Sequence, residues 1–398
     1  MLEQHCPPKE ERSGRKAQVA TADRSGLLPA PLPSTQASVF FSLVLSHCLS
    51  LPERLAAAPP CGTILRVDPL THGLASLALQ RGFFPRATWR TALVIVVAGT
   101  VADLDWFTAA FGPAGYLRWH RTATHGLLFV AALAILIGLF RWATRRIQRG
   151  ASWIGLSWPA IAAAGLLHIA LDALQSDAIA PLWPFFDRRF AFDLLPNLDP
   201  ALLVILTAAI LLPELLRLVS DEIGSRAKRP RGRNGAIIGF ALLAVYIGAR
   251  GLLHGNATAY LDSHTIAGET PRRVAAFPDT LSPILWHGIV ETDSTLDLLS
   301  VRTLGSETSD ATGVATLRKP ETSSILAAAQ ASKAAVYFLQ FARFPKATTQ
   351  KEMEGFSAEI IDLKDQASEE NSRTIFADIN LDKSGAVVSS ELQWRDHK

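Results

Sequence analysis

Histidine and aspartate recur in the first half of the chain at spacings that suit a metal ion. They form four motifs: Asp68-Pro-Leu-Thr-His72, Ala102-Asp103-Leu-Asp105, His120-Arg121-Thr-Ala-Thr-His125 and His168-Ile-Ala-Leu-Asp172. His168 and Asp172 are four residues apart, so on a helix their side chains point the same way and can bind one ion. The three cysteines all lie at or before Cys61, so a site built from these motifs has no thiolate. Imidazole with carboxylate suits Zn²⁺, or Mn²⁺ or Fe²⁺, in a catalytic rather than a structural site.

Asp103 and Asp105 are two residues apart and would diverge on a regular helix. Either the helix departs from regular geometry there, or one aspartate ligates while the other orients a histidine. Arg121 offers a planar fork of donors for an anionic group such as phosphate, although it could instead be an interfacial anchor. We predict catalytic roles for Arg121 and Asp105, and the predicted metal ligands are His72, Asp103, Asp105, His120, His125, His168 and Asp172.

The predicted chemistry is hydrolysis, because a bound divalent cation makes hydroxide available at neutral pH. Any single histidine in an apolar segment is more often a packed residue than a ligand. The prediction therefore depends on all four motifs coming together.

Composition indicates the environment of these motifs. Of the 398 residues, 49% are hydrophobic and only 19% are charged, whereas soluble domains carry about 25% charged residues. This excludes a simple cytosolic enzyme and a disordered chain. The net charge of +3 is too small to indicate a nucleic-acid partner.

Apolar runs between the motifs predict five or six membrane-spanning segments, of which the first is the weakest candidate. They are Leu70 to about Phe84, Ala92–Val101, Gly126–Trp142, Ile154–Leu171, Ala201–Val219 and Ala236–Leu253. The later segments approach the ~20 residues that a bilayer requires. We therefore expect a mainly α fold, a multi-span helical membrane bundle.

Basic residues orient these segments. They form three clusters: Arg81, Arg86 and Arg90; Arg141, Arg145, Arg146 and Arg149; and Arg226, Lys228, Arg229, Arg231 and Arg233. The clusters lie at alternate ends of successive segments, so all three can be cytoplasmic. All four motifs then fall at the outer face, where ionisable groups in apolar segments are functional candidates.

Three parts of the chain differ in character. Residues 1–66 are predicted to be a disordered or non-native extension, since Val67 is what an internal GTG start codon would be translated as. Residues 67–254 form the predicted membrane domain. Residues 255–398 are predicted to form a small α+β or β-rich extracytoplasmic domain, because short runs alternate polar and apolar residues.

Details of this last part follow from the same alternation. Its runs are Trp286–Val290, Ala334–Phe341, Glu359–Leu363 and Thr374–Asn380. Asp382-Lys-Ser-Gly385 predicts a hairpin turn rather than a calcium loop. His254, His264 and His287 are predicted to be interfacial or surface residues.

The four motifs, in this order, resemble the LexA-regulated, inner-membrane-associated metal-dependent hydrolase family (YdjM-like). The family has Met-Asp-x-x-Thr-His, Pro/Ala-Asp-x-Asp, His-Arg-x-x-Thr-His and His-x-x-x-Asp, followed by a Trp-Pro-Phe segment. The last has its counterpart at Trp183-Pro184-Phe185, whereas Gln175-Ser176-Asp177 replaces the family's small residues and glycine. The resemblance implies a metal-dependent hydrolase bound in a bacterial inner membrane.

The order of ligands is also similar to that of zinc-dependent phospholipases C, which implies a phosphoester substrate, either lipid-linked or small. Those enzymes add a later His-x-x-x-Glu pair that this sequence lacks after Asp172. Two alternatives remain: a transporter or proton relay using buried histidine and aspartate, and a non-catalytic membrane scaffold.

Overall fold

The computed structural model describes residues 68–85, 87–147, 158–222, 232–266, 268–304, 312–367 and 373–396. All of them belong to one compact unit, Pro59–Lys398. The predictions for residues 1–66, for a start at Val67, for Arg149 of the second basic cluster and for most of the third basic cluster lie outside the described residues.

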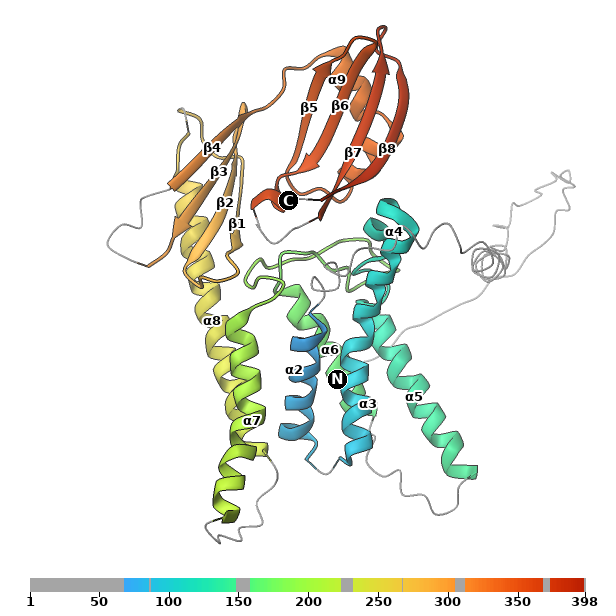
Figure 1. Cartoon of the computed structure of the whole chain (residues 1–398), viewed down its shortest axis with the longest axis vertical. Coiled ribbons are helices and arrows are strands. Elements are labelled where there is room, and N and C mark those ends of the chain that lie inside the picture. Colours follow the sequence, from blue (N-terminus) through green and yellow to red (C-terminus); the bar gives the residue numbers. More distant parts are fainter. Residues whose placement is uncertain are drawn as a thin grey trace, which may run out of the picture. The chain divides into compact units, whose positions relative to one another are not determined.

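Helices make up the first part of this unit (Figure 1). They are α2 (Pro69–Phe83), α3 (Trp89–Thr100), the 3₁₀-helix η3 (Val101–Phe111), α4 (Gly112–Trp119), α5 (Leu127–Ile147), α6 (Trp158–Ala173), α7 (Pro200–Glu222) and α8 (Arg233–Ser263). The start of α2 follows from its sequence. Asp68 caps the helix by accepting a hydrogen bond from the Thr71 N–H at 2.8 Å, and Pro69 occupies the first turn.

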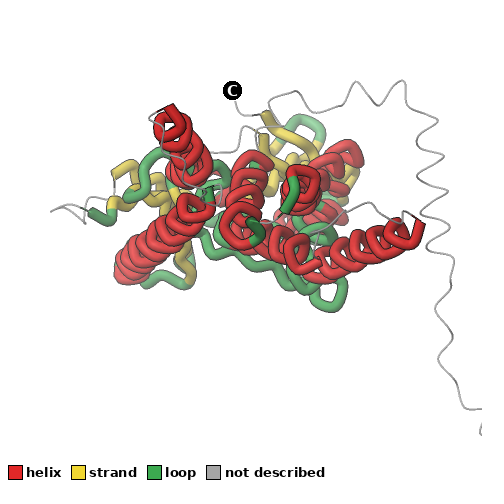
Figure 2. Tube along the Cα trace, turned by 90° about the horizontal axis from the view of Figure 1, so that it is seen from below, coloured by secondary structure: helices red, strands yellow, loops and turns green. Residues whose placement is uncertain are grey.

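Small residues take part in the helix packing, and many large apolar side chains face outward. Ala75, Ala160 and Ala164 are fully buried, whereas Leu136 on α5 and Val204 on α7 are 65% and 67% exposed. Figure 2, seen from below, shows these helices beside one another with the strands beyond them. Such an apolar outer surface is expected for helices whose solvent is a bilayer.

Three stretches of helix are long and apolar enough to cross a membrane: Trp89–Trp119, Pro200–Leu218 and Arg233–Ser263. The first contains α3, η3 and α4 in succession. The apolar helices Leu127–Phe140 and Trp158–Ala173 are shorter. A mainly helical region with three candidate spans among the described residues is therefore confirmed, and the five or six predicted segments are not confirmed.

Strands make up the second part of the unit, as two antiparallel four-stranded sheets. The first contains β1 (Arg273–Pro278), β2 (Leu285–Glu291), β3 (Thr295–Arg302) and β4 (Thr312–Arg318). The second contains β5 (Pro345–Lys351), β6 (Gly355–Asp362), β7 (Arg373–Asp382) and β8 (Val387–Asp396). Helices α9 (Ser324–Gln330), α10 (Lys333–Leu339) and α11 (Lys364–Ala367) accompany them. The predicted β-rich C-terminal region is confirmed.

The hairpin between β7 and β8 also agrees with the sequence prediction. Asp382 accepts hydrogen bonds from the backbone N–H groups of Ser384 and Ala386, and Gly385 adopts a φ of 85°. The expected strand at Ala334–Phe341 is wrong, because α10 occupies most of it. The Ser332 hydroxyl caps this helix, and Ala334, Ala335 and Phe338 bury one helical face.

Helix α8 links the two parts. It continues to Ser263, past the boundary expected at His254. Its last turns bury Ala257 and Leu261 against Trp286 of β2, in a core that belongs to the strand region. Arg250, one turn before His254, has its guanidinium carbon 4.4 Å from the Trp286 ring centroid. The helix therefore forms part of both cores.

Candidate metal centre

Four buried side chains from three helices converge at one point. His72 lies in the first turn of α2, Asp103 in the first turn of η3, and His168 and Asp172 near the end of α6. One possible ligand atom from each lies within 4.8 Å of all the others. The sequence predicted all four residues as ligands, and the fold brings them together.

Direct contacts within this group centre on Asp172. Its Oδ1 is 3.3 Å from His72 Nε2, and its Oδ2 is 3.1 Å from His168 Nε2. Asp103 Oδ1 is 3.7 Å from the same nitrogen of His168. Two imidazoles and two carboxylates therefore face one another in a volume the size of a coordination sphere.

Backbone geometry fixes the tautomer of His168. Its Nδ1 lies 2.9 Å from the carbonyl oxygen of Gly99. Because a carbonyl oxygen only accepts hydrogen bonds, Nδ1 must donate, which leaves the Nε2 lone pair of the neutral ring facing Asp103 and Asp172. Gly99 is required here, since a Cβ at this position would overlap Ser76 Oγ. The close contact between α2 and α3 thus places the Gly99 carbonyl that orients His168 of α6.

The donor atoms fit a divalent cation. Among the described residues, His72 Nδ1 and Asp103 Oδ2 are buried without a hydrogen-bond partner. Buried polar atoms are nearly always satisfied, and carboxylates facing one another in a low-dielectric interior are unfavourable without a compensating charge. The set of two nitrogens and two oxygens, with no sulfur, is one that zinc, manganese and iron accept.

His125 lies beside this group and Asp105 lies behind His125. His125 Nε2 is 2.8 Å from Asp172 Oδ2 and 3.1 Å from His168 Nε2, while its Nδ1 is 3.1 Å from Asp105 Oδ2. A carboxylate that accepts from one ring nitrogen directs the other nitrogen toward the centre. Asp105 is therefore placed to orient His125.

Asp105 holds the rest of the same loop as well. It accepts hydrogen bonds from the Arg121 backbone N–H at 2.8 Å and from the Thr124 hydroxyl at 2.7 Å. Its Oδ1 is 2.8 Å from Nδ1 of His120. His120 and Asp105 thus lie outside the group of four possible ligands. The 3₁₀ geometry of η3, with about 3 residues per turn, sends Asp103 and Asp105 to different sides.

Arg121 connects this centre to the loop after α6. Its Nη2 donates to Gln175 Oε1 at 2.6 Å and lies 3.5 Å from Asp172 Oδ1, and its Nη1 donates to the Asp177 carbonyl at 2.9 Å. Arg121 is buried and has a φ of 55°, a region sparsely populated by residues other than glycine. Burial would lower the pKa of its guanidinium, but the charges of Asp172 and Asp177 raise it instead, so Arg121 stays positive.

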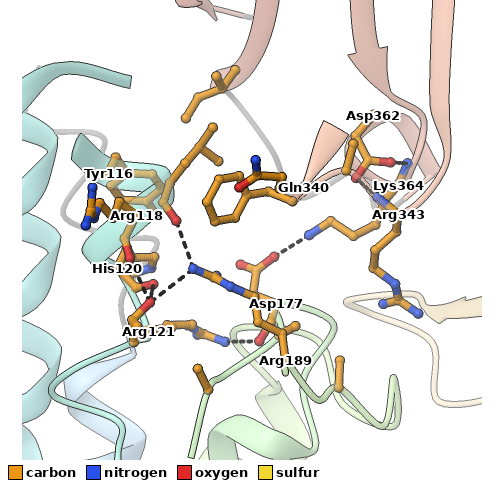
Figure 3. Close-up of a pocket in the computed structure, with 18 of the residues that line it drawn as sticks. Tyr116, Arg118, His120, Arg121, Asp177, Arg189, Gln340, Arg343, Asp362 and Lys364 are labelled. Carbon is orange, nitrogen blue, oxygen red and sulfur yellow. Dashed lines mark hydrogen bonds and ion pairs between the residues drawn. The ribbon is translucent and has the colours of Figure 1, made fainter. Parts of the chain in front are cut away.

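A cavity of about 910 Å³ is lined by both parts of the unit (Figure 3). None of the four converging residues lines it, but Arg121, which contacts Asp172, does. His120 and Arg121 line it from one side, and Arg343 and Lys364 from the other. Lys364 forms an ion pair with Asp177. Burial would raise the pKa of Asp177 and lower that of Lys364, but their mutual attraction outweighs burial and shifts each pKa the opposite way.

Two further contacts join the same parts. Arg343 binds the Asp193 carboxylate through both terminal nitrogens, each at 2.7 Å, and the Tyr337 hydroxyl donates to the Ala114 carbonyl at 3.1 Å. The strand region thus forms one wall of the cavity.

Sequence reasoning did not identify several of these residues. Thr124 lies within the third motif but was given no role. Asp177 lies in Gln175-Ser176-Asp177, the tripeptide that departs from the family pattern. That departure is the feature of the sequence that could have identified it. Nothing in the sequence indicates that Arg343 and Lys364 reach the cavity, because their contacts with Asp193 and Asp177 span 150 and 187 residues.

Comparisons with known proteins agree with the motifs. Residues 67–257 match the model of the YdjM inner membrane protein family. No curated protein and no solved structure matches the chain, and no comparison supports the likeness to phospholipase C. With the three long apolar helices, the match supports a location in the bacterial inner membrane. Over residues 67–257 the chain is therefore similar to the YdjM inner membrane protein family.

Proposed function

We propose that the chain is a membrane-bound, metal-dependent hydrolase of phosphoesters. The single observation that carries this proposal is the convergence of His72, Asp103, His168 and Asp172, with their donor atoms within 4.8 Å of one another. Ionisable groups inside apolar helices are costly, so their gathering in one buried place calls for a function.

The four converging residues would hold the cation, and His125 lies close enough to join them. A divalent cation in such a site lowers the pKa of water and so supplies a nucleophile for hydrolysis at neutral pH. Zinc is the cofactor we favour, with manganese or iron as the alternatives.

The chain's own residues position the substrate and the ligands. Asp105 and Thr124 hold the loop that carries His125, through the contacts described above. Arg121 places a permanent positive charge beside Asp172, where it would neutralise an anionic substrate group. The Gln175 and Asp177 contacts keep this guanidinium in place.

The proposed orientation puts this centre and the strand region outside the cytoplasm, with five or six segments in the membrane. The basic end of α2, marked by Arg81, is at the end of the helix opposite His72. Under the positive-inside rule the centre then lies at the outer face. The test is a reporter enzyme that is active only in the periplasm, fused after Asp396. If this orientation holds, the fusion is active.

A transporter or proton relay is less well supported. Such a protein needs ionisable groups through the depth of its spans. Among the described helices the buried histidines and aspartates instead gather at one end, as His72 at the start of α2 and Asp172 at the end of α6 illustrate.

Hydrolysis is tested with detergent-purified protein and a panel of phosphomonoesters and phosphodiesters. We expect activity that a chelator removes and that added Zn²⁺ or Mn²⁺ restores, and that is absent in Asp172→Asn. Wild-type protein that contains metal and hydrolyses no member of the panel would contradict the hydrolase proposal.

A further inference from the structure

We infer that one turn of the loop between α6 and α7 docks into the lipid surface at the end of the helical region. The turn consists of residues 181–186, and Leu182, Phe185 and Phe186 make the contact. Its partner is the boundary between headgroups and acyl chains in one leaflet of the bilayer. This contact requires neither a bound metal nor hydrolysis.

Hydrogen bonds within the backbone give the turn a helix-like shape. The N–H groups of Phe185 and Phe186 both donate to the Leu182 carbonyl, at 3.0 and 3.2 Å. Residues that are three and four positions apart in such a turn share one side of it. Leu182, Phe185 and Phe186 are 42%, 74% and 65% exposed. Three large apolar side chains therefore form one exposed face, which we call the apolar face of the turn.

The loop that carries this face is fixed at its base. Ile179 and Phe190 exchange two backbone hydrogen bonds, at 2.9 and 2.8 Å, which close the loop. Within the turn, Trp183 packs edge-on against Trp119, with ring centroids 6.1 Å apart. Because the loop is already ordered, it loses little conformational entropy when its apolar face meets a partner.

The two sides of the turn differ in chemistry. Trp183, Asp187 and Arg188 line the cavity described above, whereas the three side chains of the apolar face do not. Asp187 and Arg188 are exposed and follow the apolar face directly in the chain. An apolar side next to exposed charges is typical of segments that lie in a membrane interface, where phenylalanine and leucine enter the acyl boundary and charged groups stay among the headgroups.

The turn also adjoins the apolar outer surface of the helices. The backbone N–H of Leu127, the first residue of α5, donates to the Pro181 carbonyl at 2.8 Å. From Leu127 and Leu128, exposed apolar side chains continue along α5 to Phe140. The apolar face of the turn therefore extends a surface for which lipid is the expected solvent.

The position of the loop fits the interface rather than the hydrocarbon core. It joins the end of α6 to the start of α7 and contacts the start of α5, so it lies at one end of the helical region (Figure 1). Irregular backbone that faces lipid is not tolerated within the hydrocarbon core. At the end of the helices the backbone can reach water and headgroups while the side chains reach the acyl chains.

A protein partner fits this face less well than lipid does. A stable protein–protein interface buries about 800 Å² on each partner, which is more than three side chains of a single turn provide. Lipid needs no such area, because each apolar side chain partitions into it separately.

The test measures which solvent surrounds each side chain. A nitroxide spin label is attached to Phe185→Cys and Phe186→Cys, each in a full-length parent whose three native cysteines are replaced by serine. The labelled proteins are reconstituted into vesicles of phosphatidylethanolamine and phosphatidylglycerol. Collisions of the label with oxygen, which concentrates in lipid, and with a water-soluble nickel chelate on both sides of the vesicle are then measured by electron paramagnetic resonance.

Two further sites calibrate the measurement. Leu136→Cys, on the exposed side of α5, is the reference for lipid. Met353→Cys is the matched control, because Met353 is also an exposed apolar residue of a tight turn, at 93%. Its β5–β6 hairpin is at the far end of the sheet, since β5 begins beside Arg343 and β6 ends at Asp362, which both line the cavity. Circular dichroism and gel filtration in detergent check that each variant folds like the parent.

We expect labels at Phe185 and Phe186 to collide with the nickel chelate at least tenfold less often than the label at Met353. Their collisions with oxygen should be as frequent as those at Leu136. This pair of results would place the apolar face of the turn in lipid.

Three results would overturn the inference. Nickel collisions at Phe185 and Phe186 as frequent as those at Met353 would place the turn in water. Few collisions with either reagent would mean that protein, such as a second copy of the chain, covers the face. Frequent nickel collisions at Leu136 would remove α5 from the bilayer and the docking surface with it. The first two results would leave the metal centre and the proposed hydrolysis untouched.

Discussion

Both regions bury apolar side chains, but among the described residues only the helical region gathers several buried histidines and aspartates in one place. On the helices, His168 and Asp172 are 2% and 1% exposed while Leu136 and Phe140 are 65% and 68% exposed. In the strand region large apolar side chains such as Trp286 are fully buried, Asp297 is a single buried carboxylate of β3, and charged residues such as Lys351 and Glu352 lie at the surface.

This difference indicates the solvent of each region, which is water for the strand region and lipid for the helical region. A soluble domain hides apolar surface from water, whereas helices in a bilayer gain nothing from burying leucine. Ionisable groups inside the helical region therefore have neither water nor lipid as a favourable environment, and only one another or a cation can stabilise them. The predictions below test this difference.

The largest effect is expected from matched aspartates, one in each region. Asp172→Asn should lose most of its metal and at least about 100-fold of its activity, since changing even outer partners of a metal costs 10–100-fold. Asp297→Asn changes a carboxylate that is equally buried, in β3. It should cost about 1–3 kcal/mol of stability and leave metal content unchanged. Elemental analysis and thermal unfolding distinguish these outcomes, and equal metal loss in both variants would erase the contrast.

Removing the largest apolar side chain of the strand region should act on stability alone. Trp286→Ala is expected to cost about 3–5 kcal/mol through lost packing against Ala257 and Leu261. Limited proteolysis should then cleave the strand region at a lower temperature, while the metal stays bound. Loss of metal in step with proteolysis would mean that the two regions are not independent.

A smaller effect on metal binding is expected at Asp105, which contacts the loop rather than the group of four. Asp105→Asn should weaken metal affinity by about 10–100-fold, because the carboxylate orients His125. Competition with a chelator of known affinity measures the change. A loss as complete as that in Asp172→Asn would make Asp105 a direct ligand.

The smallest effect is expected at the ion pair between the regions. Lys364→Gln should lower stability by about 1 kcal/mol, since the pair is partly exposed. The lowered pKa of Asp177 gives stability above its ordinary value of 3.8, which is lost as the pH falls through the folded-state pKa. The raised pKa of Lys364 gives stability below 10.5, which is lost as the pH rises through the folded-state pKa.

The difference between wild type and Lys364→Gln should thus be constant from about pH 5 to 9 and shrink outside that window. Denaturant unfolding at several pH values measures it. A difference that changes steadily across the window would show that other groups control this contact.

Local signals predicted much of the fold. Asp68 and Pro69 begin a helix because their cap and ring suit its first turn, and the β7–β8 hairpin follows from its turn residues. The prediction for Ala334–Phe341 was wrong because its apolar residues fit helical spacing as well as alternation. The Ser332 hydroxyl caps the helix and so favours it over a strand. The five or six predicted spans are not confirmed, because described apolar helices such as α6 are shorter than the candidate spans.

The centre was partly predictable for a related reason. His168 and Asp172 share a helix face, so their spacing is informative, and the basic clusters placed the other motifs at the same end. The roles of Asp103 and Asp105 were left open because they depend on the 3₁₀ geometry of η3. The cavity wall was not predictable, since Arg189 and Lys364 meet it only through the tertiary fold.

The most direct test of the account is the metal content of detergent-purified protein, wild type beside Asp172→Asn, by elemental analysis. The account predicts about one zinc, manganese or iron ion per wild-type chain and less than about a tenth of that in the variant. Wild type without such an ion, or equal amounts in both proteins, would contradict it.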